Sequence, residues 1–373
     1  MNSLETRIAA VRKSIADNGI DTLLVLMEEN RRYLSGFTAE DHQFDESAGA
    51  LLINENRLVL TTDSRFELQA KREAPLFEIQ IYQKGLAKEL STLAERMNSA
   101  RIGIESARVT VKQYNEFLKE LQTAQSVVEL VPMEEMVESL RLVKTPQEVE
   151  RTRKALFLAE EAFLEVARTL KPGMTEKELA WSMEKVMREK GADGLSFPVI
   201  VAAGPNSALP HAIPTDRPIN SGEPILFDWG ARLNGYCSDT TRTVLIGQPD
   251  ETFHKVYHTV LQAQQKAIAA IKDGISSKEV DRVARDYIHG QGFEGKFGHG
   301  LGHGTGLAVH EGPRLSPLKD TVLRSGMIVT VEPGIYLPEW GGIRIENQVV
   351  VGSEGPQVLN RLSETFDIQM LEL

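Results

Sequence analysis

The sequence predicts a two-domain protein, with an α/β domain over residues 1–131 followed by an α+β domain over residues 132–373. Length is the first reason, because 373 residues exceed what a single hydrophobic core usually supports. The second reason is that short apolar runs alternate with amphipathic helical patterns over about the first 125 residues, which indicates an α/β unit with a mostly parallel or mixed sheet. The third is that helices followed by strands fill residues 145–246 and again residues 251–351, a pattern that hints at internal duplication.

The elements of the first domain follow from the spacing of apolar residues. An amphipathic helix is expected over 3–18, because apolar residues recur there every three or four positions. Further helices are expected at 65–73, 86–97 and 111–121, and strands at 21–27, 49–53, 57–61, 77–82 and 102–105. Residues 126–132 are interpreted as the passage between the domains.

Two capping boxes mark the first helices of the second domain. Thr145 and Glu148 flank one helix start, and Thr175 and Glu178 flank the next. These helices are expected to run to about residues 170 and 190. The remaining elements are expected to be a strand at 197–201, a turn at 204–207, helices at 251–271 and 277–291, and strands at 328–331 and 343–351.

Composition argues against several classes of protein. The net charge of −11 disfavours a nucleic-acid-binding surface, and no run approaches the ~18 apolar residues of a membrane span. Cys237 is the only cysteine, so no intramolecular disulfide can form, which suits a reducing compartment. No apolar segment follows the first residues, so no secretory signal is expected. We therefore expect a cytoplasmic protein that binds neither nucleic acid nor membranes.

Residues 227–241 predict a hairpin that carries two carboxylates. Apolar runs at 224–227 and 241–246 flank Asn234-Gly235, a strong signal for a two-residue turn. That turn places Asp228 opposite Thr241 and puts Asp228 and Asp239 on one face of the hairpin, roughly 7–8 Å apart at Cα. Two carboxylates in one volume repel each other, so either one is protonated or a metal ion lies between them.

A glycine-rich run at 297–311 holds three of the eight histidines. Five glycines between residues 298 and 306 allow backbone to approach backbone or a ligand closely. His299 is interpreted as a hydrogen-bonded loop histidine. For His303 and His310, a structural role and a catalytic or metal-binding role remain open.

Two glutamates stand inside apolar strand patterns, where an unpaired carboxylate costs several kcal/mol. Glu332 precedes a Pro-Gly turn and is alternatively an exposed strand-end residue, whereas Glu346 is alternatively the ion-pair partner of Arg344. If these glutamates met Asp228 and Asp239, the four carboxylates would carry a charge of −4, which two divalent cations would cancel. Oxygen ligands with one imidazole, from His303, suit Mn²⁺, Co²⁺, Fe²⁺ or Zn²⁺. Such a pair of ions assists hydrolysis by lowering the pKa of a water molecule and polarising a carbonyl.

These residues resemble the motifs of the pita-bread metallopeptidase family, which includes methionine aminopeptidase, aminopeptidase P and prolidase. Asp228 and Asp239 are eleven residues apart, Glu332 and Glu346 are fourteen apart, and the Gly-His-Gly…Val-His-Glu run stands between the pairs. The resemblance covers essentially the whole chain and is closest to bacterial Xaa-Pro dipeptidases and aminopeptidases P. It implies a pita-bread catalytic domain, a creatinase-type N-terminal domain, and a homodimer in which the N-terminal domain limits access to short peptides. Asn347 departs from the family, where aspartate is common.

The resemblance also implies a metal site for two divalent ions, Mn²⁺ or Co²⁺ in preference to Zn²⁺ or Fe²⁺. Asp228 and Asp239 would bind the first ion, and His303 and Glu332 the second. Asp239 and Glu346 would bridge the two.

Further roles follow from the same resemblance. His211 matches a histidine near the scissile peptide, and His310 matches one that helps to stabilise the tetrahedral intermediate. Glu332 is the usual proton shuttle. Candidates for binding or supporting the substrate are Arg314, which many prolidase-like members share, Tyr336 and Arg344.

The predicted reaction is metal-dependent hydrolysis of the Xaa-Pro bond in dipeptides or short peptides. Arg314 favours dipeptides, since a free carboxylate next to proline needs a cation. The alternatives are an aminopeptidase acting on longer Xaa-Pro peptides, a methionine aminopeptidase, and a non-catalytic pita-bread protein that binds other proteins. The large N-terminal domain argues against the second alternative. The intact ligand pattern argues against the third, and against a metal-independent creatinase.

Overall fold

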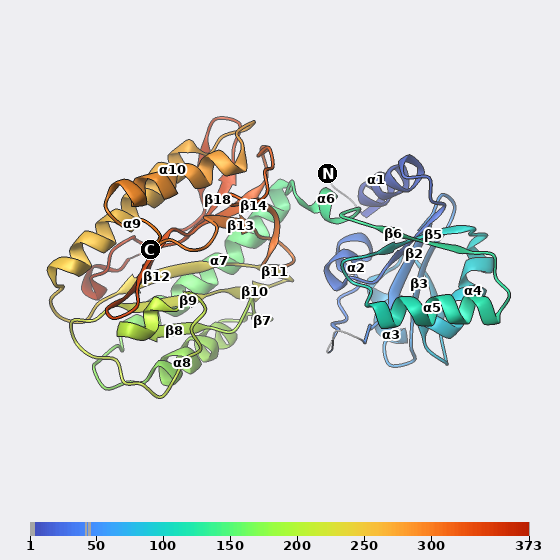
Figure 1. The fold of residues 1–373 in the computed structure, drawn as a ribbon. Helices are drawn as coiled ribbons and strands as arrows, with labels where there is room; N and C mark the ends of the chain where they lie inside the picture. Colours follow the sequence, from blue (N-terminus) through green and yellow to red (C-terminus); the bar gives the residue numbers. More distant parts are fainter. Residues whose placement is uncertain (1–3, 42, 44–45, 373) are drawn as a thin grey trace. The chain divides into compact units, whose positions relative to one another are not determined.

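The structure, a computed structural model, describes residues 4–41, 43 and 46–372. The chain divides into two compact units between Arg141 and Leu142, ten residues beyond the boundary expected from the sequence. Each unit is one continuous stretch of the chain, as the colours along the sequence show in Figure 1. No helix among the described residues is both long enough and apolar enough to cross a membrane.

The first unit is a six-stranded mixed sheet with helices, in the strand order β4-β3-β2-β1-β5-β6. β1 pairs antiparallel with β2 and parallel with β5, so the predicted α/β sheet is confirmed as mixed. α4 and α5 contribute Leu90 and Phe117 to a core shared with the sheet. The elements are α1 (Leu4–Asp17), β1 (Thr22–Val25), α2 (Glu28–Ser35), β2 (Ala50–Asn54), β3 (Leu58–Thr62), α3 (Glu67–Glu73), β4 (Glu78–Ile81), α4 (Leu86–Met97), β5 (Arg101–Glu105), α5 (Val111–Thr123), β6 (Glu129–Met133) and α6 (Glu138–Arg141).

The passage expected at 126–132 is wrong, because most of it forms strand β6. This strand pairs in parallel with β5 over its whole length and is the last strand of the sheet. Pro132 fits this position, since proline is excluded from central strands but is tolerated on an edge strand such as β6.

The second unit contains two pairs of helices, α7 with α8 and α9 with α10, and each pair packs against its own strands (Figure 1). Its elements are α7 (Pro146–Ala167), α8 (Glu176–Glu189), β7 (Gly194–Leu195), β8 (Ile200–Ala203), η1 (Gly204–Ala208), β9 (Ile225–Trp229), β10 (Ala231–Leu233), β11 (Tyr236–Cys237), β12 (Thr240–Val244), α9 (Glu251–Ala270), α10 (Ser277–Gly290), β13 (Gly302–Gly304), β14 (Glu311–Leu315), β15 (Ile328–Val331), β16 (Gly334–Leu337), β17 (Gly341–Arg344), β18 (Asn347–Val351), β19 (Pro356–Val358) and η2 (Ile368–Met370).

Local sequence signals explain why α7 and α8 begin where they do. The hydroxyl groups of Thr145 and Thr175 accept from the backbone N–H groups of Glu148 and Glu178, so both predicted capping boxes are confirmed. The strand expected at 197–201 begins only at Ile200.

The predicted hairpin register is confirmed. Asp228 on β9 pairs with Thr241 on β12, and Leu233 on β10 pairs with Tyr236 on β11 across the turn. Asn234 and Gly235 have φ values of 50° and 80°, the left-handed conformations that a two-residue turn of type I′ requires. The two-residue turn at Asn234-Gly235 therefore sets the register of the hairpin, and the register determines which face carries Asp228.

Helix α7 holds the strand that carries Asp228. The ring of Phe163 stacks on Trp229 with centroids 4.4 Å apart, and the Trp229 indole Nε1 donates to the Ala159 carbonyl at 2.9 Å. Both aromatic residues are fully buried. The β9 backbone is thus fixed by core packing next to the position where the site lies.

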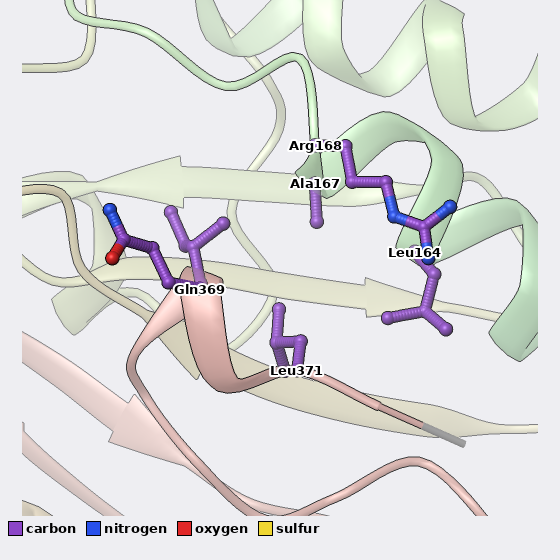
Figure 2. A pocket seen from close by; sticks show the side chains of 6 residues that line it. Leu164, Ala167, Arg168, Gln369 and Leu371 are labelled. Atoms are coloured by element: carbon purple, nitrogen blue, oxygen red, sulfur yellow. The ribbon is translucent and has the colours of Figure 1, made fainter.

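A small cavity of about 360 Å³ lies between the end of α7 and η2 (Figure 2). It is lined by Leu164, Ala167, Arg168, Ile368, Gln369 and Leu371. None of these side chains is a carboxylate, imidazole or thiol, so the lining offers no metal ligand of the kind that the sequence predicted.

Candidate metal centre

The five predicted metal ligands come from five places in the second unit and line a single cavity of about 650 Å³. Asp228 lies on β9 and His303 on β13. Asp239 directly precedes β12, Glu332 directly follows β15, and Glu346 lies in the break between β17 and β18. The strand expected over 343–351 is thus two strands, and the carboxylate occupies the interruption.

Backbone hydrogen bonds place the two glutamates beside their partners. The N–H of Glu346 donates to the Thr241 carbonyl at 3.1 Å, and the N–H of Glu332 donates to the Leu301 carbonyl at 2.8 Å. Gly302 allows β13 to approach β15 this closely, because a Cβ atom at that position would lie 2.0 Å from the Thr330 carbonyl oxygen. The middle of the glycine-rich run is therefore a closely packed strand, β13.

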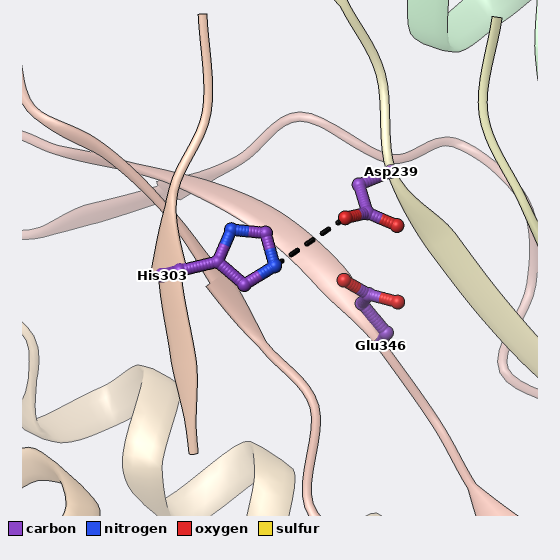
Figure 3. A group of neighbouring side chains, drawn as sticks. All are labelled: Asp239, His303 and Glu346. Carbon is purple, nitrogen blue, oxygen red and sulfur yellow. Dashed lines mark ion pairs between the residues drawn. The ribbon is translucent and has the colours of Figure 1, made fainter. Parts of the chain in front are cut away.

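The Nε2 atom of His303 faces the carboxylates of Asp239, which Figure 3 shows, and of Glu332. Nε2 lies 3.5 Å from Oδ2 of Asp239 and 3.5 Å from Oε1 of Glu332. The other ring nitrogen, Nδ1, lies 3.0 Å from the Gly304 carbonyl oxygen, which can only accept. Nδ1 therefore carries the ring proton, and burial lowers the pKa of His303 to about 3, so Nε2 presents a lone pair to the carboxylates.

Three groups offer ligand atoms within 4.8 Å of one another: Asp239, His303 and Glu346. Oδ1 of Asp228 and Oε1 of Glu346 are buried oxygens without a hydrogen-bond partner among the described residues. The second oxygen of Glu346 accepts from the Thr241 hydroxyl at 2.7 Å, and that of Asp228 accepts from Arg344 at 2.7 Å. Each of these two carboxylates thus has one oxygen that accepts a hydrogen bond from the protein and one oxygen without a partner among the described residues.

Burial raises the pKa of all four acids. Burial raises the pKa of Asp239 and of Glu346 well above their ordinary values, and repulsion by neighbouring carboxylates adds to the effect. Burial also raises the pKa of Glu332, to about 7, and that of Asp228. A cation among these carboxylates would favour their ionised forms and so lower their pKa values.

A divalent metal fits this donor set. A lone pair of His303 faces carboxylates, and two buried oxygens lack partners among the described residues, so the protein alone leaves these atoms unsatisfied. Binding of His through Nε2, with Nδ1–H donating to a carbonyl, is the usual arrangement of a metal-ligating histidine. The donor chemistry therefore supports a metal centre, while the assignment of individual ligands remains a prediction.

Arg344 does not pair with Glu346, the alternative that the sequence left open. Its Nη2 atom donates to Oδ2 of Asp228 at 2.7 Å, and its Nε atom donates to the Thr241 hydroxyl at 3.1 Å. Tyr336 is not part of the cavity lining, and its hydroxyl accepts from Nη1 of Arg344 at 3.0 Å. Tyr336, a predicted candidate for binding or supporting the substrate, thus contacts Arg344 and does not line the cavity.

The remaining predicted residues surround the same cavity. His211, His310 and Arg314 all contribute to its lining. The His310 ring lies edge-on to His303 with centroids 4.4 Å apart, and burial lowers its pKa. Arg314 pairs with His303 in the strand register, is exposed, and forms no ion pair with a described acidic residue.

Two polar residues that support the site were not predicted. Thr330 accepts from the His303 backbone N–H at 3.0 Å and donates to Oε1 of Glu332 at 3.1 Å. Gln264 on α9 is fully buried and donates from Nε2 to the carbonyl oxygens of Val331 and Ile345, at 3.1 and 3.0 Å. A signal for Gln264 existed, because it is a polar residue on the apolar face of a helix.

Two family matches cover most of the chain. Residues 150–353 match metallopeptidase family M24, and residues 7–143 match the creatinase/prolidase N-terminal domain. Among curated proteins, an Xaa-Pro dipeptidase from Pyrococcus horikoshii is 32% identical over 97% of this chain and 98% of its own length.

Solved structures give the same result. An Xaa-Pro dipeptidase from Bacillus anthracis is 36% identical with a TM-score of 0.92, covering 98% of this chain and 99% of the other. An X-Pro aminopeptidase from Thermotoga maritima is 37% identical with a TM-score of 0.84, covering 95% and 99% of the two chains. The predicted pita-bread catalytic fold and the creatinase-type N-terminal domain are thereby confirmed. The chain belongs to metallopeptidase family M24 and carries its catalytic unit behind a creatinase/prolidase N-terminal domain.

Proposed function

We propose that this metallopeptidase hydrolyses the bond before proline in Xaa-Pro dipeptides. The observation that carries the proposal is a cavity lined by four carboxylates, two of which lie 3.5 Å from Nε2 of His303, and by the guanidinium of Arg314. Support for the substrate comes from the relatives, since two of the proteins most similar to this chain are Xaa-Pro dipeptidases.

Two divalent ions would be held by Asp228, Asp239, His303, Glu332 and Glu346, with Asp239 and Glu346 between them. Two ions would balance the charge of the four carboxylates, and the mixture of oxygen ligands with one imidazole favours Mn²⁺ or Co²⁺ ahead of Zn²⁺ or Fe²⁺. When bound, the ions would lower the pKa of a water molecule and polarise the scissile carbonyl.

Glu332 is the residue best suited to move the proton. Burial raises its pKa to about 7, and Thr330 holds its Oε1 atom at 3.1 Å. Glu332 would accept a proton from the attacking water and donate it to the imide nitrogen of proline as the peptide bond breaks. His310 and His211, which come from separate segments of the cavity lining, would stabilise charge on the carbonyl oxygen and position the peptide.

The cavity also offers groups for the two ends of a short substrate. Phe197, Val199 and Ile213 line it with apolar surface that suits a proline ring and the side chain before it. Arg314 has no acidic partner among the described residues, so its guanidinium would bind the carboxylate of the proline.

The second candidate is an aminopeptidase that cleaves the same bond in longer peptides. It is favoured by the similarity to the Thermotoga maritima X-Pro aminopeptidase, at 37% identity. A methionine aminopeptidase is disfavoured by the match of residues 7–143 to the creatinase/prolidase N-terminal domain. A non-catalytic binding protein would not need the complete ligand set.

The deciding experiment measures turnover of Xaa-Pro, Xaa-Pro-Yaa and Met-Ala peptides with Mn²⁺, Co²⁺, Zn²⁺ and Fe²⁺ in turn. Cleavage of Xaa-Pro dipeptides, together with about two metal ions per chain, is the expected result. Asp239→Asn should lose both metal and turnover, while Asp216→Asn, an exposed acid paired with Lys177 at 2.7 Å, should lose neither. Preference for Met-Ala, or less than about one metal per chain in active protein, would overturn the proposal.

We further propose that the protein is a cytoplasmic homodimer. The proposal rests on the family resemblance and on the single buried cysteine, which leaves no intramolecular disulfide. Light scattering of the purified protein should give twice the chain mass of 41.4 kDa, and a mass of one chain would refute the dimer.

A further inference from the structure

A chain of hydrogen bonds runs behind Asp228 and ends at His299. Nη2 of Arg344 lies 2.7 Å from Oδ2 of Asp228, and Nη1 of Arg344 lies 3.0 Å from the Tyr336 hydroxyl. The Tyr336 hydroxyl in turn lies 2.8 Å from Nε2 of His299. His299, expected to be a hydrogen-bonded loop residue, is therefore linked to a predicted metal ligand through two intervening side chains.

The direction of every bond in this chain is fixed by chemistry. Nδ1 of His299 lies 2.8 Å from the Gly300 carbonyl oxygen, which can only accept, so Nδ1 carries the proton and Nε2 must accept. The Tyr336 hydroxyl therefore donates to His299, and its oxygen accepts from Arg344. Arg344 has no acceptor atom, so it can only donate to Asp228.

The environment of His299 holds it in this state. Arg285 on α10 donates from Nη2 to the His299 carbonyl at 2.8 Å, and the Phe297 ring packs edge-on to the imidazole with centroids 5.0 Å apart. Burial lowers the pKa of His299 to about 4, so its imidazole is neutral near pH 7. The backbone of His299, the orientation of its imidazole and the position of its ring proton are thus all set by the protein itself.

The consequence lies at the carboxylate of Asp228. Arg344 occupies Oδ2, whereas Oδ1 is buried and has no hydrogen-bond partner among the described residues. The guanidinium thereby decides which oxygen is free and where it points. Because the Tyr336 hydroxyl donates to His299, it cannot rotate to donate elsewhere, and its oxygen remains available to Arg344.

We propose that His299 is a positioning residue that, through Tyr336 and Arg344, orients Asp228 to bind a divalent cation through its Oδ1 atom. The inference rests on the proposed metal centre and deepens it. It differs from the expectation for His299, which is that of a loop histidine with a structural role only. Outer hydrogen-bond partners of metal ligands typically contribute 10–100-fold to metal affinity. We expect an effect of that size on one of the two ions.

The test titrates the metal-free protein with Mn²⁺ alone by calorimetry, and needs no substrate. His299→Leu removes the acceptor for Tyr336, and we expect it to weaken one Mn²⁺ site about 10–100-fold. His299→Gln keeps a carbonyl oxygen at the place of Nε2, and we expect affinity within about threefold of the parent. His289→Leu is the matched control, because His289 is an exposed histidine paired only with Glu294 at 3.0 Å among the described residues.

Tyr336→Phe breaks the same chain at its next link and provides the second variant. If His299→Leu does not fold, Tyr336→Phe should still weaken the same Mn²⁺ site, and in a folded double variant the two losses should not add. Equal Mn²⁺ affinity in the parent, His299→Leu and Tyr336→Phe would overturn the inference. So would equal losses in His299→Gln and His299→Leu. Failure of the parent protein itself to bind Mn²⁺ would instead refute the metal centre.

Discussion

Gln264 donates from its side-chain Nε2 to the carbonyl oxygen of Ile345 at 3.0 Å. The same nitrogen donates to the carbonyl oxygen of Val331 at 3.1 Å. These two carbonyls belong to the residues immediately before Glu346 and Glu332. One fully buried amide on α9 thus ties together the two backbone positions that aim both glutamates into the cavity.

Replacing Gln264 with Leu should destabilise the protein and loosen the metal centre. Two buried carbonyl groups would lose their donor, each at a cost of about 1–3 kcal/mol in the free energy of unfolding. Urea unfolding and Mn²⁺ titration measure the two effects. Gln265→Leu, an exposed position on the same helix, is the control and should change neither quantity. Parent-like stability and affinity in Gln264→Leu would show that the amide is dispensable.

Glu332 should contribute stability to the metal-free protein that is lost as the pH rises from about 4.5 to about 7. Burial raises the pKa of Glu332 from 4.5 to about 7, so between these values the folded chain holds a proton at Glu332 that the unfolded chain has released. The contribution of this group to the free energy of unfolding therefore falls with rising pH, by at most about 1.4 kcal/mol per pH unit. The raised pKa values of Asp239 and Glu346 act in the same direction, whereas the lowered pKa values of His299, His303 and His310 act in the opposite direction.

Urea unfolding with a chelator at pH 5 to 8 tests this expectation. Glu332→Gln removes this titrating group, so the free energy of unfolding of the parent minus that of the variant should fall as the pH rises. Adding Mn²⁺ should stabilise the protein more at pH 8 than at pH 5, because metal binding requires ionised carboxylates. A difference between parent and Glu332→Gln that stays constant or grows with rising pH would contradict the raised pKa of Glu332.

Most of the fold could be predicted because its signals are local. Capping boxes and apolar periodicity located α7 and α8, and a two-residue turn fixed the register of the hairpin. The errors arise where tertiary contacts override local pattern. β6 contains a proline tolerated only because the strand lies at an edge, and β13 is a glycine-rich strand that depends on close contact with β15.

The site divides in the same way between the predictable and the unpredictable. Carboxylates in apolar strands are conspicuous in a sequence, so Glu332 and Glu346 could be selected from local pattern alone. Their partners could not, because Gln264 is separated from Ile345 by 81 positions and Arg344 reaches Asp228 across 116. Sequence pattern therefore identifies the ionisable groups, while the pairings that orient them emerge only from the fold.

Arg314→Ala should impair cleavage of Xaa-Pro dipeptides more than that of Xaa-Pro-Yaa peptides. The guanidinium is exposed in the cavity without an acidic partner among the described residues, so a substrate carboxylate is its natural counterion. A hydrogen bond to a charged group contributes about 1.5–3 kcal/mol, so we expect kcat/KM for the dipeptide to fall roughly 10–100-fold. Arg153→Ala, at a partly exposed position on α7, is the control. Equal losses for both substrates would assign Arg314 to catalysis or folding and leave dipeptide selectivity unexplained.

Asn347 stands where the family resemblance leads us to expect aspartate, and Glu364 offers a reason for the asparagine. The Asn347 carbonyl oxygen accepts from Nη2 of Arg242 at 2.9 Å, and its amide nitrogen donates to Oε1 of Glu364 at 2.5 Å. Arg242 is fully buried and also donates to the carbonyl oxygen of Glu346 at 2.6 Å, so the arrangement supports a predicted metal ligand. An amide can accept from the arginine and donate to the glutamate at the same time, whereas an ionised carboxylate can only accept.

Asn347→Asp should therefore destabilise this protein. The new carboxylate would keep the bond to Arg242 but face Glu364 as a like charge without a donor, at a cost of about 1–3 kcal/mol in the free energy of unfolding. Adding Glu364→Gln should restore most of that loss, since the glutamine amide can donate to the new carboxylate. Urea unfolding of the parent, both single variants and the double variant gives the coupling energy directly. A double variant no more stable than Asn347→Asp would mean that Glu364 does not determine the choice of residue at 347.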